Sequence, residues 1–421
     1  MPEQTIYAQQ HPAVSDCMPA PIVVGGGING LSAVRSLAQA GLSPLVVVTS
    51  LFDVAAVSRY ARPVTAGTFD GETLLNEMIR LRSRLPQGGA LIFAEDDPLL
   101  ALSPLRDRLA PYFDFKMPSH QLLLDLTVKE RFFQLAQQNG FPVPRTLLLR
   151  KYSDLAGMND LRLPLCVKPN SHTKTYHDLF KKAYRLDKRS VARQLCERIL
   201  DTVGEVIVQE WIEGPNDSIY FSLCYMDEPA SVAFTGRKGR SWPPQIGITA
   251  SCWPAQDIAQ ELEDLTIHFF QSVGLTNGYA SMEYKRDQRD GRFLMVEPTA
   301  GRTDGQVEIS ALCGINLCHI AYCDAAGLPR PPLELDPHHV WRDEFRDFLA
   351  ARKLRTRLSY PPGYQIHNAF WRWNDPAPAL LQSALNSKMA LGRVFDMVFA
   401  EHRGNHPLEP ETFNQSHTRR P

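Results

Sequence analysis

The decisive stretch of the chain is Phe293-Leu294-Met295-Val296-Glu297-Pro298-Thr299-Ala300-Gly301-Arg302. Four apolar residues followed by a glutamate predict a buried β-strand whose carboxylate stands at the end of a sheet. A second glutamate, Glu283, closes the mainly apolar segment that begins at Tyr279. The two segments predict a hairpin with a carboxylate on each strand.

The turn between these strands contains Asp290-Gly291 and decides whether the two carboxylates converge. Side chains alternate faces along a strand, so a two-residue loop would turn Glu297 away from Glu283, whereas a three-residue loop would set them opposite each other. Facing Cβ atoms lie about 4.5–5.5 Å apart, close enough for two carboxylates to share an ion. We therefore expect an odd-length loop or an equivalent bulge, with a positive φ at Gly291.

Cations and a second set of strands precede the hairpin. Lys129 lies on a helix predicted over residues 128–139, and Lys168 ends an apolar strand that begins at Leu165. A cation there is costly unless it meets an anion or water. A further strand begins at Val206 and closes with Gln209-Glu210-Trp211-Ile212. Two cations for phosphates, an adenine-sized hinge and paired carboxylates for Mg²⁺ are what a nucleoside triphosphate site requires.

In this order the motifs resemble the ATP-grasp superfamily of carboxylate–amine and carboxylate–thiol ligases, over about residues 20–330. The segment Phe234–Arg240 adds a similarity to the carbamoyl-phosphate-synthase-like and D-aspartate-ligase-like branch. The resemblance implies an α/β protein. A Rossmann-like pre-ATP-grasp domain would be followed by an ATP-grasp fold of two α+β subdomains and a C-terminal accessory segment.

The resemblance also implies a role for each residue of the nucleotide site. The predicted nucleotide-binding residues are Lys129 and Lys168 for the phosphates, Gln209, Glu210, Trp211 and Ile212 for adenine, and Asp217 for the ribose.

The resemblance further implies metal-binding and catalytic residues. Glu283 and Glu297 match the carboxylates that bind Mg²⁺, with Mn²⁺ as an alternative ion, and Thr299 replaces the usual asparagine ligand. Arg302 comes one residue later than usual and would steady the γ-phosphate and the acyl phosphate, together with Lys168. The implied enzyme is an ADP-forming ligase that joins a small-molecule carboxylate to an amine.

Two alternatives remain open at this point. Thr299 and the glycine-poor loop 170–182 are compatible with a protein that binds ATP without ligating anything. The spacing Gly25-x-Gly27-x-x-Gly30, between a predicted strand and a predicted helix, is also typical of NAD(P)-dependent oxidoreductases. However, the second strand, Leu45–Val48, is followed only later by an acid, Asp53, so the ribose acid is missing. A structural turn that lines a substrate pocket is the favoured interpretation.

The 421 residues carry 45 Lys+Arg and 46 Asp+Glu, a net charge of −1, which excludes a globally basic nucleic-acid binder. There is no apolar run long enough for a membrane span and no secretory signal, and the 8 cysteines form no C-x-x-C pair. We therefore expect a cytoplasmic enzyme, with homodimer formation left open. The predicted division is disordered tails at 1–20 and 402–421, the Rossmann-like domain 21–118, the ATP-grasp domain 119–330 with a lid at about 145–210, and the C-terminal region 331–401.

Overall fold

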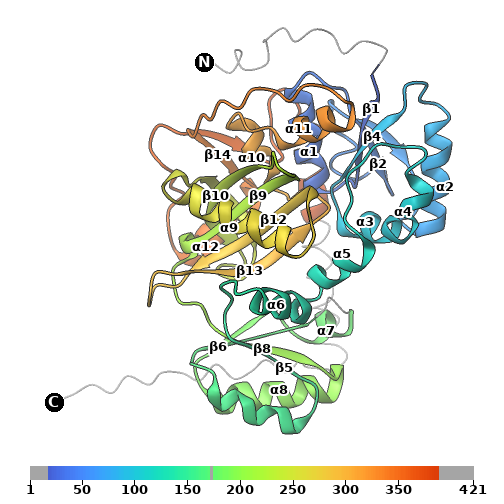
Figure 1. Cartoon of the computed structure of the whole chain (residues 1–421). Helices are drawn as coiled ribbons and strands as arrows, with labels where there is room; N and C mark the ends of the chain where they lie inside the picture. The colour runs from blue at the N-terminus through green and yellow to red at the C-terminus, as the bar shows by residue number, and fades with distance from the viewer. Residues whose placement is uncertain (1–17, 171–173, 388–421) are drawn as a thin grey trace, which may run out of the picture.

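The computed structural model describes residues 18–170 and 174–387. The predicted tails, apart from residues 18–20, therefore lie outside the described residues. Three sheets make up the described chain, with four, seven and four strands. The chain passes from the first sheet through two helices to the small third sheet and then builds the large one (Figure 1).

The N-terminal sheet is parallel, with the order β3-β2-β1-β4, as the predicted Rossmann-like layer requires. Alternate side chains of β1 and β2 enter two different hydrophobic clusters, so both faces of the sheet are covered. The helix predicted after the glycine loop begins at Ile28, so Gly30 lies in its first turn. The elements are β1 (Ala20–Val24), α1 (Ile28–Gln39), β2 (Leu45–Val48), β3 (Arg62–Thr65), α2 (Gly71–Arg82), β4 (Gly89–Phe93), α3 (Asp96–Leu102), η1 (Ser103–Leu105) and α4 (Arg106–Leu109).

The small sheet forms a separate lobe, drawn at the bottom of Figure 1, and all its strands fall within the predicted lid range. It is antiparallel, with the order β5-β8-β6-β7, and has its own hydrophobic cluster beneath α8. Two helices, α5 (His120–Thr127) and α6 (Lys129–Gln138), lead into it. Its elements are β5 (Thr146–Leu149), η2 (Tyr152–Asp160), β6 (Leu165–Lys168), α7 (Lys174–Leu179), β7 (Tyr184–Leu186), α8 (Arg189–Val203) and β8 (Val206–Glu210).

The large sheet has the order β13-β12-β9-β10-β11-β14-β15 and lies between two hydrophobic clusters. One cluster packs it against α9 and α6, and the other packs it against α1, α10 and α11. Its elements are η3 (Asn216–Ser218), β9 (Ile219–Asp227), β10 (Val232–Trp242), β11 (Ile248–Pro254), η4 (Gln256–Ile258), α9 (Ala259–Ser272), β12 (Asn277–Arg286), β13 (Phe293–Ala300), α10 (Val307–Leu312), α11 (Leu317–Ala325), β14 (His339–Arg342), α12 (Glu344–Leu354) and β15 (Gln365–Asn368).

The C-terminal region, predicted as an accessory segment, adds two strands to the large sheet. Strand β14 pairs with β11, and β15 pairs in parallel with β14, so this region completes the large sheet. Trp371 and Trp373 follow β15 and lie outside it. They stand at a turn closed by a bridge between Arg372 and Asp375, and Trp373 is 77% exposed. The local sequence did not reveal this pairing, because β14 pairs with β11, which lies far away in the chain.

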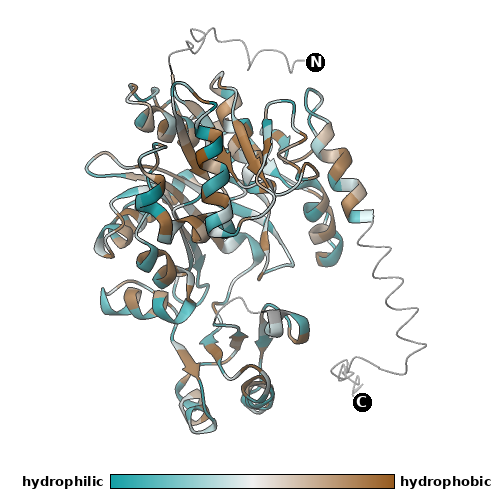
Figure 2. Cartoon of the chain, turned by 90° about the vertical axis from the view of Figure 1, so that its right-hand side faces the viewer, coloured by the Kyte–Doolittle hydropathy of each residue, from teal (hydrophilic) through white to brown (hydrophobic). Residues whose placement is uncertain are grey.

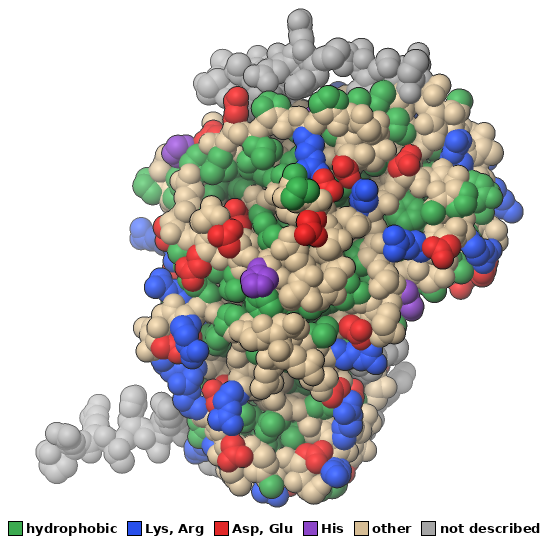
Figure 3. Space-filling model, in the orientation of Figure 1, with side chains coloured by type: hydrophobic (Ala, Val, Ile, Leu, Met, Phe, Trp, Pro, Cys, Tyr) green, Lys and Arg blue, Asp and Glu red, His purple; other side chains and the backbone are tan. Residues whose placement is uncertain are grey.

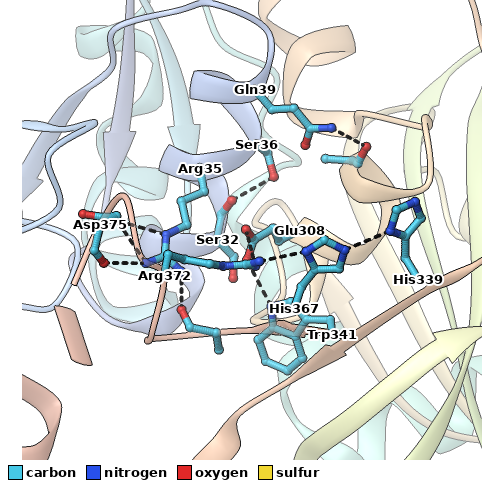
Figure 4. Close-up of polar contacts among 12 residues, drawn as sticks. Ser32, Arg35, Ser36, Gln39, Glu308, His339, Trp341, His367, Arg372 and Asp375 are labelled. Carbon is cyan, nitrogen blue, oxygen red and sulfur yellow. Dashed lines mark hydrogen bonds and ion pairs between the residues drawn. The ribbon is translucent and has the colours of Figure 1, made fainter. Parts of the chain in front are cut away.

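Buried polar contacts fasten this turn to the N-terminal layer (Figure 4). Arg35 on α1 forms an ion pair of 3.0 Å with Asp375, and its guanidinium also donates to the carbonyl oxygen of Phe370 at 3.0 Å. Arg372 donates to Glu308 at 3.0 Å and to Nδ1 of His367 at 2.9 Å. An arginine only donates, so the proton of His367 is on Nε2 and points to Nδ1 of His339. The C-terminal turn therefore joins α1, α10 and two strands.

The surface agrees with the near-zero charge. Lys and Arg lie interspersed with Asp and Glu over the face in Figure 3, and hydrophobic colouring in Figure 2 is concentrated on the interior strands. Within the described ranges, no helix is long and apolar enough to cross a membrane. Seven cysteines fall in the described part of the chain, and all seven are buried free thiols.

Candidate active site

Lys129 and Lys168 are brought together by Asn170, two residues after the end of β6. Asn170 caps α6, because its side-chain oxygen accepts from the Glu130 N–H at 3.0 Å and its carbonyl accepts from the Lys129 N–H at 3.3 Å. The cap fixes the first residue of α6, Lys129, beside the end of β6, where Lys168 stands. Both lysines line one cavity of about 160 Å³. The sequence placed both lysines on the correct elements but contained no sign of this cap.

Lys168 is a buried cation at the end of β6. It is 9% exposed, and its ammonium lies 4.9 Å from the centroid of the Phe133 ring. Burial lowers the pKa of Lys168, and the neighbouring Lys129 adds to this effect. An anion in the cavity would favour the charged form of this lysine.

Glu283 and Glu297 face each other across β12 and β13, as predicted. The connection itself is not a three-residue loop, because Arg286 pairs with Phe293. The register is instead corrected by a bulge at Val296, which was the predicted alternative to an odd-length loop. Gly291 has a φ of +75°, also as predicted.

Each of the two carboxylates has a lysine beside it. Glu283 pairs with Lys238 on β10, and Oε1 of Glu297 lies 3.6 Å from the ammonium of Lys129. Lys238 is 2% exposed, and it is a site residue that the sequence prediction did not include. The charge run Arg237-Lys238 was the available signal, but a run of cations is usually a solvated face. Only the sheet shows that Lys238 turns inward.

The residue set is compatible with a magnesium ion. Within residues 18–170 and 174–387, no group of three or more His, Cys, Asp or Glu converges into a complete metal cage. Two oxygen-bearing carboxylates on one face of a hairpin, beside a lysine-lined cavity, suit Mg²⁺, which is commonly held by one or two carboxylates and by phosphate oxygens. Thr299 does not point to a vacant ligand position, because its hydroxyl donates to Asp304 at 3.2 Å.

The hinge residues Gln209, Glu210, Trp211 and Ile212 line the same cavity. Two of their side chains have other partners. The Gln209 amide donates to the Thr146 hydroxyl at 2.7 Å, and the Glu210 carboxylate accepts from the Arg162 N–H at 2.9 Å. The hinge therefore offers mainly backbone groups. Adenine recognition by these residues stays a prediction.

The structure differs from the prediction at two charged residues, Lys285 and Asp217. Lys285 is buried and lines the cavity, and burial lowers its pKa to about 8. Asp217, predicted for the ribose, is exposed and is not among the cavity residues, and its carbonyl accepts from Arg237 at 2.8 Å. The structure thus adds a cation at the hinge and does not bring Asp217 to it.

Arg302 and Thr299 belong to a second cavity, of about 310 Å³. Asp304 receives hydrogen bonds from Thr299, from Ser281 and from Arg302, and Arg302 also donates to Asp96 of α3 at 2.9 Å. Lys129, Lys238, Glu283 and Glu297 line both cavities. The two spaces therefore meet at the carboxylate pair.

The glycine loop lies at the far side of this second cavity, where Ile28 and Asn29 form part of its wall. The N–H of Gly27 donates to the Glu95 carboxylate at 2.6 Å. A Cβ on Gly30 would lie 2.0 Å from the carbonyl oxygen of Gly25, so glycine is needed there for close packing. These contacts support the interpretation of a structural turn that lines a substrate pocket, and they leave Gly27 occupied by a carboxylate in place of a phosphate.

Comparison with solved structures defines the class of this fold. A biotin carboxylase from Campylobacter jejuni, solved as a β,γ-ATP complex, matches 76% of this chain and 74% of its own with a TM-score of 0.59 and 13% identity. An L-amino acid ligase from Bacillus licheniformis matches 77% of this chain and 79% of its own with a TM-score of 0.57 and 17% identity. The chain has the ATP-grasp fold, so the predicted resemblance and fold class are confirmed.

The sequence comparison points to the ligase branch. A D-aspartate ligase from Enterococcus faecium is 24% identical over 296 residues, which are 66% of this chain and 70% of that protein. No protein-family model matches the sequence. Proteins similar to this chain in sequence and in structure are thus ligases, in agreement with the prediction of an ATP-dependent ligase.

Proposed function

We propose that the chain is an ATP-dependent carboxylate–amine ligase that activates a carboxylate as an acyl phosphate. The observation that carries the proposal is the common wall of the two cavities. The lysine-lined cavity at the hinge and the cavity around Arg302 share Glu283, Glu297, Lys129 and Lys238. A phosphoryl group can therefore pass from a nucleotide in one space to an acceptor in the other.

The first chemical step moves the γ-phosphoryl group. A carboxylate oxygen of the substrate attacks the γ-phosphorus of ATP, the bond to the β–γ bridging oxygen breaks, and ADP leaves. Lys129 and Lys168 would hold the phosphates, and Arg302 would hold the carboxylate in the second cavity. Mg²⁺ held by Glu283 and Glu297, or Mn²⁺ in its place, would supply charge neutralisation on the phosphates.

The second step forms the carbon–nitrogen bond. An amine attacks the acyl carbon, the carbon–oxygen bond to the phosphate breaks, and phosphate leaves while the nitrogen loses a proton. We propose an amino acid as one of the two substrates. Support comes from the second cavity, which is lined by Arg302 together with Asp96 and Asp304, charges of the two signs that an amino acid also carries. These groups pair with one another, so the ammonium and carboxylate of an amino acid would replace those ion pairs. Closure of the lid over residues 145–210 would keep water away from the acyl phosphate.

The test is a screen for ADP release. The chain is incubated with Mg-ATP, a panel of amino acids and small carboxylic acids, and a panel of amines, and the nucleotides are separated by chromatography. ADP and phosphate are expected, in equal amounts, only when both a carboxylate and an amine are present. Formation of AMP and pyrophosphate would contradict the acyl-phosphate route. Nucleotide binding without any ADP release would favour a protein that only binds ATP, an alternative consistent with Thr299 being engaged by Asp304.

A further inference from the structure

Lys285 is a cation inside the hinge cavity that has no role in the proposed chemistry. It stands on β12, is 6% exposed, and lines the cavity together with Lys168 and the hinge residues 209–212. Its ammonium lies 4.6 Å from the centroid of the Trp211 ring, directly after β8. It follows Met282-Glu283-Tyr284 and lies on the face of Glu283, yet its side chain is buried. A lysine here calls for an explanation.

The strand fixes the end of the cavity to which Lys285 belongs. Glu283 and Lys285 are two residues apart and so share a face, with their Cα atoms separated by roughly 6–7 Å along the strand. Glu283 faces Glu297 and Lys238, where the phosphates and the metal would lie. Lys285 faces Trp211 at the other end. A nucleotide with its phosphates at the carboxylate pair would therefore bring its base toward Lys285.

The acids around Lys285 already have other cationic partners. Glu213 pairs with Arg185 at 3.3 Å, Glu283 pairs with Lys238, and Asp287 pairs with Arg289. In the part of the chain that the structure describes, the Lys285 ammonium has an aromatic contact but neither a hydrogen bond nor an ion pair. Its three N–H donors are thus available to a ligand.

Two side chains of the hinge residues 209–212 already have hydrogen-bond partners within the protein. Gln209 donates to Thr146, and Glu210 accepts from the backbone of Arg162. Lys285 lies beside these hinge residues and lines the same cavity with a donor group that has no hydrogen-bond partner among the described residues. The geometry points to Lys285 as a specificity-determining residue that donates a hydrogen bond to the nucleotide base. This inference rests on the proposed nucleotide site and adds to it a side chain that selects the base.

The test compares four nucleoside diphosphates. Binding of ADP, GDP, CDP and UDP, each with Mg²⁺, is measured by displacement of a fluorescent ATP analogue from the full chain and from three variants. Lys285→Met removes the donor and keeps the length, and Lys285→Arg keeps a donor. Lys353→Met on the exposed surface of α12 is the matched control. Thermal melting establishes that each variant is folded, and Lys285→Leu, which also lacks a donor, replaces the methionine variant if that variant does not fold.

The expected result is a loss of base preference. ADP affinity should fall at least tenfold in Lys285→Met while the other three affinities change less than threefold, and Lys285→Arg and Lys353→Met should keep the order of the unchanged protein. An equal loss for all four nucleotides would place Lys285 at the ribose or phosphates and overturn the inference. Unchanged ADP affinity in Lys285→Met would also overturn it. If the unchanged protein binds none of the four, the proposed function itself fails.

Discussion

Lys168 is the residue at which burial and charge conflict most directly. Its ammonium sits against the Phe133 ring at the end of a buried strand, with Lys129 nearby. Burial of a cation without an anion costs free energy, and this cost lowers the pKa of the lysine. A bound triphosphate would remove much of this cost. We therefore expect Lys168 to contribute to anion binding more than to folding.

Replacing Lys168 with alanine should weaken ATP binding about 10- to 100-fold, since a hydrogen bond to a charged group contributes about 1.5–3 kcal/mol. The melting temperature should stay the same or rise, because the variant no longer buries a cation. Titration calorimetry with Mg-ATP measures the first effect, and calorimetric melting measures the second. Lys353→Ala is the surface control. Equal ATP affinities for Lys168→Ala and the unchanged protein would remove Lys168 from the site.

The hairpin of β12 and β13 is the element that brings together the two carboxylates of the proposed metal site. From Tyr284 to Arg286 the strands pair in a register that would set Val296 opposite Glu283. The bulge shifts β13 by one residue, so that Glu297 takes that place and turns to the same face. Beyond the bulge, Thr299 pairs with Ser281, and both bond to Asp304. One extra residue in one strand thus assembles the carboxylate pair.

Glu283→Gln and Glu297→Gln should each reduce ADP formation by at least about 100-fold, because each variant removes half of the charge that would hold the metal. The fold should survive, since glutamine keeps the size of the side chain. Steady-state rates measured over a range of Mg²⁺ concentrations are the readout, and Glu261→Gln on exposed α9 serves as the control. Full activity in either hairpin variant at low Mg²⁺ would show that the metal binds elsewhere.

For the whole molecule, the C-terminal turn acts as a clasp between the N-terminal layer and the large sheet. Asp375 is 1% exposed and accepts hydrogen bonds from Arg35, from the Ser58 hydroxyl at 2.8 Å and from the Arg59 N–H at 2.9 Å. Arg372, three residues earlier, bonds to Glu308 on α10, whose other oxygen accepts from Trp341 on β14 at 3.1 Å. Trp341 also lines the second cavity. The clasp therefore lies directly behind the proposed substrate space.

Asp375→Ala should lower the free energy of unfolding by about 3–5 kcal/mol, because it leaves the buried Arg35 guanidinium without its counter-ion. Urea denaturation followed by fluorescence measures the change. The exposed pair Arg80–Glu77 gives the control, since Glu77→Ala should cost less than about 1 kcal/mol. If both variants lose the same small amount, the clasp does not contribute to stability.

The sequence alone determined the local elements and the residue types of the site. The apolar run Leu45–Val48 marked β2 with the bounds that the structure shows, because an uninterrupted apolar run reports burial directly. The order of Lys129, Lys168, Glu283 and Glu297 was enough to indicate an ATP-grasp protein. It also reduced the hairpin to two registers, of which one could hold a metal.

Only the tertiary structure decided which side chains meet. Four features of the site and the fold depend on contacts between different strands. They are the bulge at Val296, the pairing of Lys238 with Glu283, the position of Lys285 against Trp211, and the entry of β14 and β15 into the large sheet. A local pattern records whether a residue is buried, but it carries no record of its neighbour across a sheet. Lys238 looks like a solvated lysine in the sequence, and only its place in the sheet shows that it is buried.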